Sequence, residues 1–249
     1  MDVAWTPPAR AGLPALVFLH EGLGSLESWK DVPQELVSLT GCGALVYSRY
    51  GNGFSETLGE PRPVSYMHDE ALVALPEVLA ALGVGDVFLI GHSDGASIAA
   101  IYACDRPGVR GVVLEAPHVF VEDLSVRSIE RAREAFRATD LRERLARYHA
   151  DVDRTFYGWN DIWLDPDFRS WNIEPYVVGI ACPVLLIQGE NDEYGTRAQI
   201  DAIRHRASHS AVDDLFLANC GHAPHRDRPA TVIAAIAAFV DECVKSAGS

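Results

Sequence analysis

The feature that most constrains the fold is a series of short runs that are apolar throughout and are followed closely by glycine or proline. These runs are residues 15–19, 44–47, 87–90, 112–114, 184–187 and 215–217. A strand that is apolar on both faces is buried on both faces, which is typical of a parallel sheet covered by helices on each side.

Longer segments with helical periodicity separate these runs. The predicted helices are residues 66–82, 96–104, 197–206 and 230–245, with Pro76 as a kink or a boundary in the first. Strands alternating with helices at this spacing indicate right-handed βαβ units, and therefore an open α/β fold. Ligands of such sheets bind beyond the carboxyl ends of the strands.

Residues 118–176 interrupt the alternation, because they contain no comparable apolar run. They hold a charged helical stretch, residues 124–148, and then a segment rich in Phe, Tyr and Trp. A long insertion after the fourth clear strand predicts a helical lid over the site, rather than an independent domain. Residues 1–117 and 177–249 then form the core. A helical pair packed only for stability is the alternative.

The charge balance excludes some classes of partner. The chain has 21 basic and 35 acidic residues, a net charge of −14, so we expect no nucleic-acid partner and no polybasic membrane anchor. No apolar run approaches the roughly 20 residues of a membrane-spanning helix. The five scattered cysteines favour free thiols in a reducing compartment. We therefore expect a cytoplasmic protein, monomer or homodimer, that acts on a small molecule.

The sequence Gly91-His92-Ser93-Asp94-Gly95 lies between a predicted strand and a predicted helix. This is the G-x-S-x-G nucleophile elbow in the context that it requires. A sharp turn exposes the Ser93 hydroxyl, and the glycines leave room for the strained backbone.

With this motif the sequence resembles the α/β-hydrolase superfamily from about residue 13 to the C-terminus. The family's chain order is serine, acid, histidine. Asp192 matches the acid position after the strand that ends near Gln188, and His222 matches the histidine position within Cys220-Gly221-His222. The resemblance implies that His222 takes the proton of Ser93, that Asp192 orients the imidazole, and that no metal or cofactor is needed.

Other residues near the same edge compete for these roles. The competing histidines are His225, His118, His20 and His92, and the competing carboxylates are Glu190, Glu193 and Glu115. His225 lacks the preceding glycine of the family pattern, and the neighbouring acids shift the spacing by one or two residues.

The resemblance also implies an oxyanion hole made of two backbone N–H groups. One belongs to Asp94, and the other comes from the loop His20-Glu21-Gly22-Leu23-Gly24. Gly22 is the expected donor, but Glu21 replaces the family's usual glycine, so Leu23 stays an alternative. We expect Glu21 to hydrogen-bond within the loop, with a contact to a polar substrate group as the alternative.

These residues predict a carboxylic ester hydrolase that cleaves an ester of a small apolar or aromatic acid through an acyl-enzyme. Glu21, Leu23, His118, Trp159 and Trp163 are the candidate lining of the substrate pocket. An acyl-CoA thioesterase, which an arginine of the insertion would favour, and a carbon–carbon bond hydrolase use the same triad. A ligand-binding receptor on a hydrolase fold is the alternative from another class.

The family usually has an antiparallel hairpin before the first strand of this pattern. The first clear run of this chain begins at residue 15. We therefore expect that the sheet lacks much of that edge.

Overall fold

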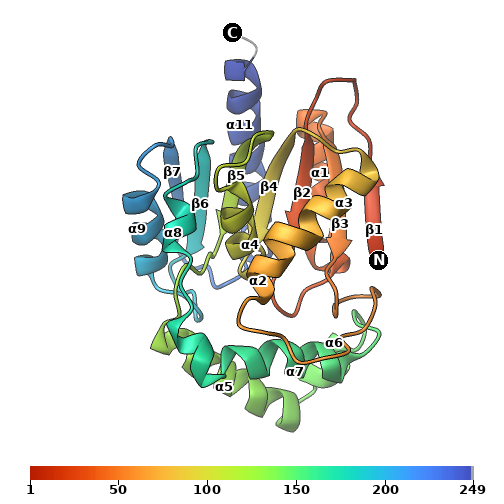
Figure 1. The fold of residues 1–249 in the computed structure, drawn as a ribbon, viewed down its shortest axis with the longest axis vertical. Coiled ribbons are helices and arrows are strands. Elements are labelled where there is room, and N and C mark those ends of the chain that lie inside the picture. Colours follow the sequence, from red (N-terminus) through yellow and green to blue (C-terminus); the bar gives the residue numbers. More distant parts are fainter. Residues whose placement is uncertain (248–249) are drawn as a thin grey trace.

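A computed structural model describes residues 1–247 and contains one seven-stranded sheet. The strands are β1 (Asp2–Thr6), β2 (Ala15–Leu19), β3 (Gly43–Ser48), β4 (Val87–His92), β5 (Val109–Glu115), β6 (Val184–Gly189) and β7 (Val212–Leu217). Their order in the sheet is β1-β3-β2-β4-β5-β6-β7 (Figure 1). All neighbouring pairs are parallel except β1 with β3, which confirms the predicted, mostly parallel sheet.

Strand β1 departs from the expectation for the N-terminal edge. It pairs antiparallel with β3 along its whole length, from Asp2 opposite Ser48 to Thr6 opposite Ala44. Its side chains are largely exposed, so its sequence has no all-apolar run that would reveal it. The sheet therefore has one antiparallel strand at the edge where we expected much of the family's antiparallel hairpin to be missing.

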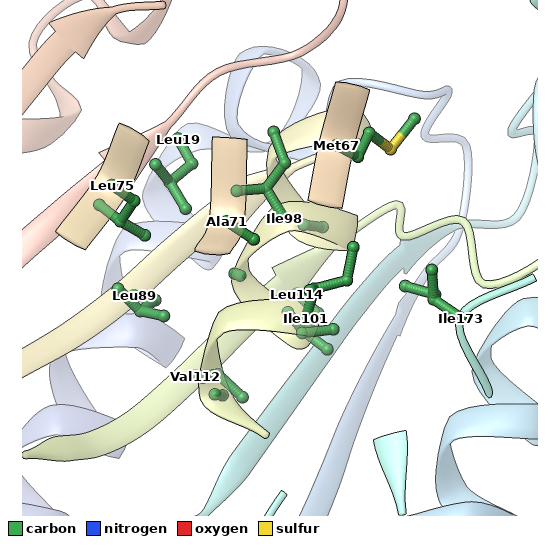
Figure 2. Packing of buried hydrophobic residues seen from close by; sticks show 14 of the residues in the cluster. Leu19, Met67, Ala71, Leu75, Leu89, Ile98, Ile101, Val112, Leu114 and Ile173 are labelled. Atoms are coloured by element: carbon green, nitrogen blue, oxygen red, sulfur yellow. The ribbon is translucent and has the colours of Figure 1, made fainter. Parts of the chain in front are cut away.

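Helices cover both faces of the sheet. Helices α1 (Val32–Thr40) and α11 (Pro229–Ala247) pack on one face. The other face carries α2 (Tyr66–Asp69), α3 (Leu75–Leu82), α4 (Asp94–Ala103), α8 (Glu174–Val177) and α9 (Arg197–Arg206). Figure 2 shows the second face, where Met67, Ala71 and Leu75 lie in a row alongside Ile98 of α4.

The predicted helix over residues 66–82 is interrupted near Pro76, where we expected a kink or a boundary. A π-helical turn, Glu70–Ala74, separates α2 from α3, and Pro76 lies in the first turn of α3. Proline has no N–H to donate to the carbonyl four residues earlier, so the regular ladder cannot run through this point.

The segment between β5 and β6 is helical. It contains α5 (Asp123–Ala138), α6 (Leu141–Leu145), α7 (Val152–Trp163) and a 3₁₀ turn, Pro166–Ser170, before α8. The predicted stretch 124–148 is thus two helices, and the aromatic segment supplies most of α7. Helices α5, α6 and α7 lie together beyond one end of the sheet (Figure 1).

Aromatic stacking forms the interior of this helical segment. The rings of Phe136 and Phe156 stack with centroids 3.8 Å apart, and Phe168 stacks on Trp171 at 5.3 Å. Within residues 1–247, no helix has the length and apolar character that crossing a bilayer demands.

The remaining helical elements are short and follow the carboxyl ends of β2 and β7. A 3₁₀ turn, Leu26–Trp29, follows the loop after β2, and α10 (Pro224–Asp227) follows the loop after β7.

The first turn of α4 lies directly against the end of β2. A Cβ on Gly95 would overlap the backbone carbonyl of Leu19 and approach that of His20. Only glycine permits this approach, which brings the β4–α4 turn against the loop that follows β2.

Gly95→Ala should therefore destabilise the fold by about 2 kcal/mol or more, because backbone atoms cannot move aside cheaply. The matched control is Gly85→Ala, since Gly85 is exposed with open space around its Cα; it should stay within about 0.5 kcal/mol. Urea unfolding of both variants measures the difference. Equal stabilities for the two variants would contradict the close packing of α4 on β2.

Candidate active site

Ser93 occupies the turn between β4 and α4. Its backbone has φ 54° and ψ −118°, a strained conformation for a residue with a side chain. Its N–H donates to the carbonyl of Glu115 on the neighbouring strand at 2.9 Å. Its carbonyl accepts from the N–H groups of Ala96 and Ser97, so the turn is held from both sides.

The Ser93 hydroxyl lies within hydrogen-bond distance of the predicted histidine. His222 Nε2 is 2.9 Å from Ser93 Oγ, and His222 Nδ1 is 2.8 Å from Asp192 Oδ1. His222 follows β7 and Asp192 follows β6, so the ends of three strands supply the three side chains. The structure thus brings all three predicted residues together.

The competing residues lie elsewhere or make other contacts. His225 is buried against Glu115, with Nδ1 2.8 Å from Oε1, and does not contact Ser93. Glu193 lies beside the triad, but its Oε2 accepts from the backbone N–H of His222 at 3.2 Å.

Asp192 is well placed to stay ionised. Its Oδ1 also accepts from the backbone N–H groups of Tyr194 and Gly195, at 2.8 and 3.1 Å. Burial alone would raise the pKa of Asp192, but the charge and hydrogen bond of His222 and the N–H donor of Tyr194 lower it to about 2. An ionised acceptor at this point keeps the proton of the His222 ring on Nδ1.

Donors from the loop after β3 hold three carbonyls of the loop after β2. Arg49 donates to the Glu21 carbonyl at 3.0 Å, and Asn52 donates to the carbonyls of Gly22 and Gly24, each at 3.0 Å. In a trans peptide the N–H points opposite to the preceding carbonyl. The N–H groups of Gly22 and Leu23 are therefore turned away from these donors.

A histidine of the helical segment completes this arrangement. His149 Nδ1 accepts from the N–H of Gly53 at 2.9 Å, which leaves the proton on Nε2 to donate to the Leu23 carbonyl at 3.0 Å. Burial lowers the pKa of His149, which favours this neutral form. The segment between β5 and β6 is thus tied to the loop after β2.

Gly22 lies directly beneath Trp159 of α7. A Cβ at this position would overlap the indole ring, so glycine lets Trp159 cover the loop. The N–H groups of Gly22, Leu23 and Asp94 have no acceptor among residues 1–247 and stay free to donate.

The carboxylate of Asp94 is bound on the side of α2. Tyr66 donates its hydroxyl to Asp94 Oδ2 at 2.7 Å, and Trp163 Nε1 donates to the Tyr66 oxygen at 3.0 Å. Burial and the Asp94 charge raise the pKa of Tyr66 well above its ordinary value, so the hydroxyl keeps its proton. This chain joins α7 to the residue that follows Ser93.

Ser93 opens into a cavity of about 300 Å³. All five predicted pocket residues line it: Glu21, Leu23, His118, Trp159 and Trp163. The prediction of the pocket missed nine further lining residues: His92, Ser125, Ile129, Glu193, Tyr194, Gly221, Ala223, Arg226 and Asp227. Most of these adjoin Asp192 or His222 in the chain, and this proximity is the only signal that could have found them.

His118 and Tyr194 flank the ring of His222. The His118 ring lies 5.6 Å from the His222 ring and 5.1 Å from that of Trp163. Burial first, and then the neighbouring His222, lower the pKa of His118 to about 3, so it is a neutral imidazole near pH 7. The ring of Tyr194 also contacts the His222 ring, with the two centroids 4.7 Å apart.

We expected the side chain of Glu21 to hydrogen-bond within its own loop, but its polar contacts lie outside that loop. Its Oε1 lies 2.7 Å from Nη2 of Arg226, on α10. Its Oε2 lies 3.5 Å from Nδ1 of His92. Glu21 therefore joins the loop after β2 to the loop that carries His222, while still lining the cavity.

The arginines of the helical segment do not reach this cavity. Arg133 pairs with Asp161, Arg142 with Asp153 and Arg169 with Asp123, so these pairs tie different parts of the segment together. The cavity is lined by four carboxylate residues and one guanidinium: Glu21, Asp94, Glu193, Asp227 and Arg226.

The chain belongs to the α/β hydrolase family, because the sequence model of that family matches residues 16–235. No group of three or more His, Cys, Asp or Glu side chains among residues 1–247 is arranged to hold a metal ion.

Similar proteins span nearly the whole chain. The 2-succinyl-6-hydroxy-2,4-cyclohexadiene-1-carboxylate synthase of Salmonella paratyphi A is 26% identical over 256 residues, covering 92% of this chain and 95% of that protein. The crystal structure of VinJ has a TM-score of 0.74 and 23% identity, covering 97% of this chain and 94% of that one. A carboxylesterase structure from Nitrososphaera gargenis has a TM-score of 0.76 and 18% identity, covering 98% and 96%. The two structures show the shared fold.

The lowered pKa of Asp192 predicts a pH-dependent contribution to stability. A carboxyl whose pKa falls on folding stabilises the native state above its ordinary pKa of 3.8, and this is lost as the pH falls toward 2. The stability difference between wild type and Asp192→Asn should therefore change by about 2 kcal/mol between about pH 5 and pH 2, in favour of wild type at the higher pH. Urea unfolding across this range measures it, and a difference independent of pH would contradict the lowered pKa of the buried Asp192 carboxyl.

Proposed function

We propose that this chain is a serine hydrolase that cleaves a carboxylic ester of a small apolar or aromatic acid through an acyl-enzyme. The observation that carries the proposal is the hydrogen-bonded chain Ser93–His222–Asp192 at the floor of a cavity, with bonds of 2.9 and 2.8 Å. A weak nucleophile, a base in reach of its proton and a carboxylate behind the base are what acyl transfer requires.

In the acylation step, Ser93 Oγ bonds to the ester carbonyl carbon while its proton moves to His222 Nε2. The carbonyl electron pair moves onto oxygen and forms a tetrahedral oxyanion. The pair then returns, the bond to the alkoxy oxygen breaks, and His222 delivers its proton to the departing alcohol. Asp192 stabilises the imidazolium that exists between these transfers.

Deacylation repeats the sequence with water. His222 takes a proton from water as the water oxygen bonds to the acyl carbon. The second oxyanion collapses, the bond to Ser93 Oγ breaks, and His222 returns the proton to the serine oxygen. The carboxylic acid then leaves and the free enzyme is restored.

We assign the oxyanion hole to the N–H of Asp94 and to an N–H of the loop after β2. Gly22 is the expected donor of that loop, and Leu23 is its alternative, since the N–H groups of both have no acceptor among residues 1–247. Fixed N–H groups that need no reorganisation stabilise the developing charge well.

The size of the cavity favours a small acyl group. Its volume of about 300 Å³ lies at the lower end of the range of about 300–1,000 Å³ for ligand sites. The indoles of Trp159 and Trp163 and the side chains of Leu23 and Ile129 give an apolar surface for an alkyl or aryl group.

The charge of the lining favours a neutral ester over a polyanionic substrate. Four carboxylate residues line the cavity, and its one guanidinium, Arg226, is already paired with Glu21. A coenzyme A thioester would carry phosphates to this surface. The product named for the Salmonella relative carries a carboxylate and a succinyl group, for which this lining offers little positive charge.

We also propose that residues 118–176 act as the lid. Ile129 of α5 and Trp159 and Trp163 of α7 line the same cavity as Ser93. The bond of His149 to the Leu23 carbonyl and that of Trp163 to Tyr66 hold this segment over the site. Such a cover excludes water from the reacting atoms.

Three alternatives remain. Two are enzymes that use the same triad, and the third is a binding protein in which the triad has no catalytic role. A thioesterase passes through the same oxyanion, and a carbon–carbon bond hydrolase is in keeping with the variety of names among the relatives. A ligand-binding receptor would keep the cavity without turnover.

A panel of p-nitrophenyl esters, matched acyl-CoA thioesters and a vinylogous diketone tests the proposal through kcat/KM. Short alkyl and benzoyl esters should be the best substrates, and Ser93→Ala should lower kcat by about a millionfold. Ser38→Ala, in an exposed position of α1, is the matched control and should keep full activity. Preference for the thioester or the diketone would replace the ester assignment, and turnover retained in Ser93→Ala would remove the proposed nucleophile.

A further inference from the structure

Glu21 is the clearest departure of this chain from the family pattern, and its contacts connect two loops of the site. The side chain lies between Arg226, 2.7 Å from its Oε1, and His92, 3.5 Å from its Oε2. It is mostly buried, with 17% of the side chain exposed, whereas Arg226 reaches solvent. The carboxylate is thus held on one side by a cation and faces an imidazole on the other.

His92 in turn holds the backbone of His222. His92 Nε2 lies 2.6 Å from the carbonyl oxygen of His222. A carbonyl can only accept a hydrogen bond, so this nitrogen carries the ring proton and donates it. A donor thereby fixes the residue whose imidazole faces Ser93.

The remaining nitrogen of His92 faces Glu21. His92 Nδ1 and Glu21 Oε2 are both buried, and neither has another hydrogen-bond partner among residues 1–247. Burial opposes ionisation of Glu21, but the contact with His92 and the charge of Arg226 hold its pKa well below its ordinary value. The 3.5 Å contact between His92 Nδ1 and Glu21 Oε2 is therefore the one polar contact that the described residues offer to either atom.

Packing leaves the His92 ring little freedom to turn. The rings of His222 and His225 lie 5.2 and 5.0 Å away, and the ring of Trp29 lies at 6.5 Å. His225 is itself held by the buried Glu115, which accepts from its Nδ1 and its backbone N–H. The direction of the His92 donor is therefore set by its surroundings and by Glu21.

We propose that Arg226, Glu21 and His92 form a positioning chain that fixes the backbone of His222 relative to Ser93 and to the loop after β2. This inference rests on the proposed function, because it assigns a role to residues behind the proposed base. Glu21 belongs to the loop that offers the oxyanion donors, so one carboxylate links the position of the donors to that of the base. None of the three residues is proposed to touch the reacting atoms.

Two substitutions of Glu21 test whether its contacts with Arg226 and His92 position His222. Glu21→Gln keeps the shape, an oxygen for Arg226 and an N–H donor for Nδ1 of His92, so kcat should stay within about threefold of wild type. Glu21→Leu keeps the volume but makes neither contact, and kcat should fall by about tenfold or more with KM little changed. The p-nitrophenyl ester preferred by the wild type is the substrate.

A second pair tests the donor on His92. His92→Phe keeps the ring packing but removes the donor to the His222 carbonyl, and His92→Gln keeps a donor of similar reach. The Phe variant should lose about tenfold in kcat and in the rate of Ser93 labelling by a fluorophosphonate, and the Gln variant should regain most of it. Thermal unfolding of all four variants checks that the loss does not follow from a destabilised fold.

A measurement without turnover keeps this inference separate from the proposed function. The low-field proton resonance of the bond between His222 Nδ1 and Asp192 should persist in wild type and Glu21→Gln, and should broaden or shift in Glu21→Leu. An unchanged resonance in Glu21→Leu, or a rise in KM at constant kcat, would overturn the positioning role. An inactive and unlabelled wild type would instead contradict the proposed function.

Discussion

The contact on which the site depends is the close approach of α4 to the end of β2. Gly95 lies against the carbonyls of Leu19 and His20, and this packing fixes where the β4–α4 turn ends. Ser93 takes its strained backbone within that turn, held by the Glu115 carbonyl of the next strand. The same contact sets the turn beside the loop that follows β2, so the proposed nucleophile and the proposed oxyanion donors share one support.

The segment between β5 and β6 supplies part of the lining of the proposed active site. It contributes Trp159 and Trp163 to the cavity. His149 ties it by a hydrogen bond to the loop after β2, and Trp163 ties it to Tyr66 of α2. Three of its arginines, Arg133, Arg142 and Arg169, form ion pairs within the segment, and none of its arginines lines the cavity, where carboxylates are in excess. The proposed preference for small, neutral esters follows from this combination of apolar walls and acidic lining.

The buried strands and the grouping of Ser93, Asp192 and His222 could be predicted because both carry local signals. All-apolar runs mark strands covered on two faces, and the glycines around Ser93 mark a turn that no other residue tolerates. The edge strand β1 carries no such signal, since its side chains are largely exposed. The contacts of Glu21 with Arg226 and His92 were equally hidden, because 205 residues separate the two ends of its hydrogen bond to Arg226.

The central claim is that Ser93 carries the acyl group between the two half-reactions. Mixing His222→Ala with a p-nitrophenyl ester should slow deacylation more than the activated first step, so that an adduct accumulates. Intact mass spectrometry should then show one added acyl group per chain, and peptide mapping should place it on Ser93. An acyl group on another residue, or hydrolysis by the wild type without any adduct in rapid-quench samples, would contradict the account.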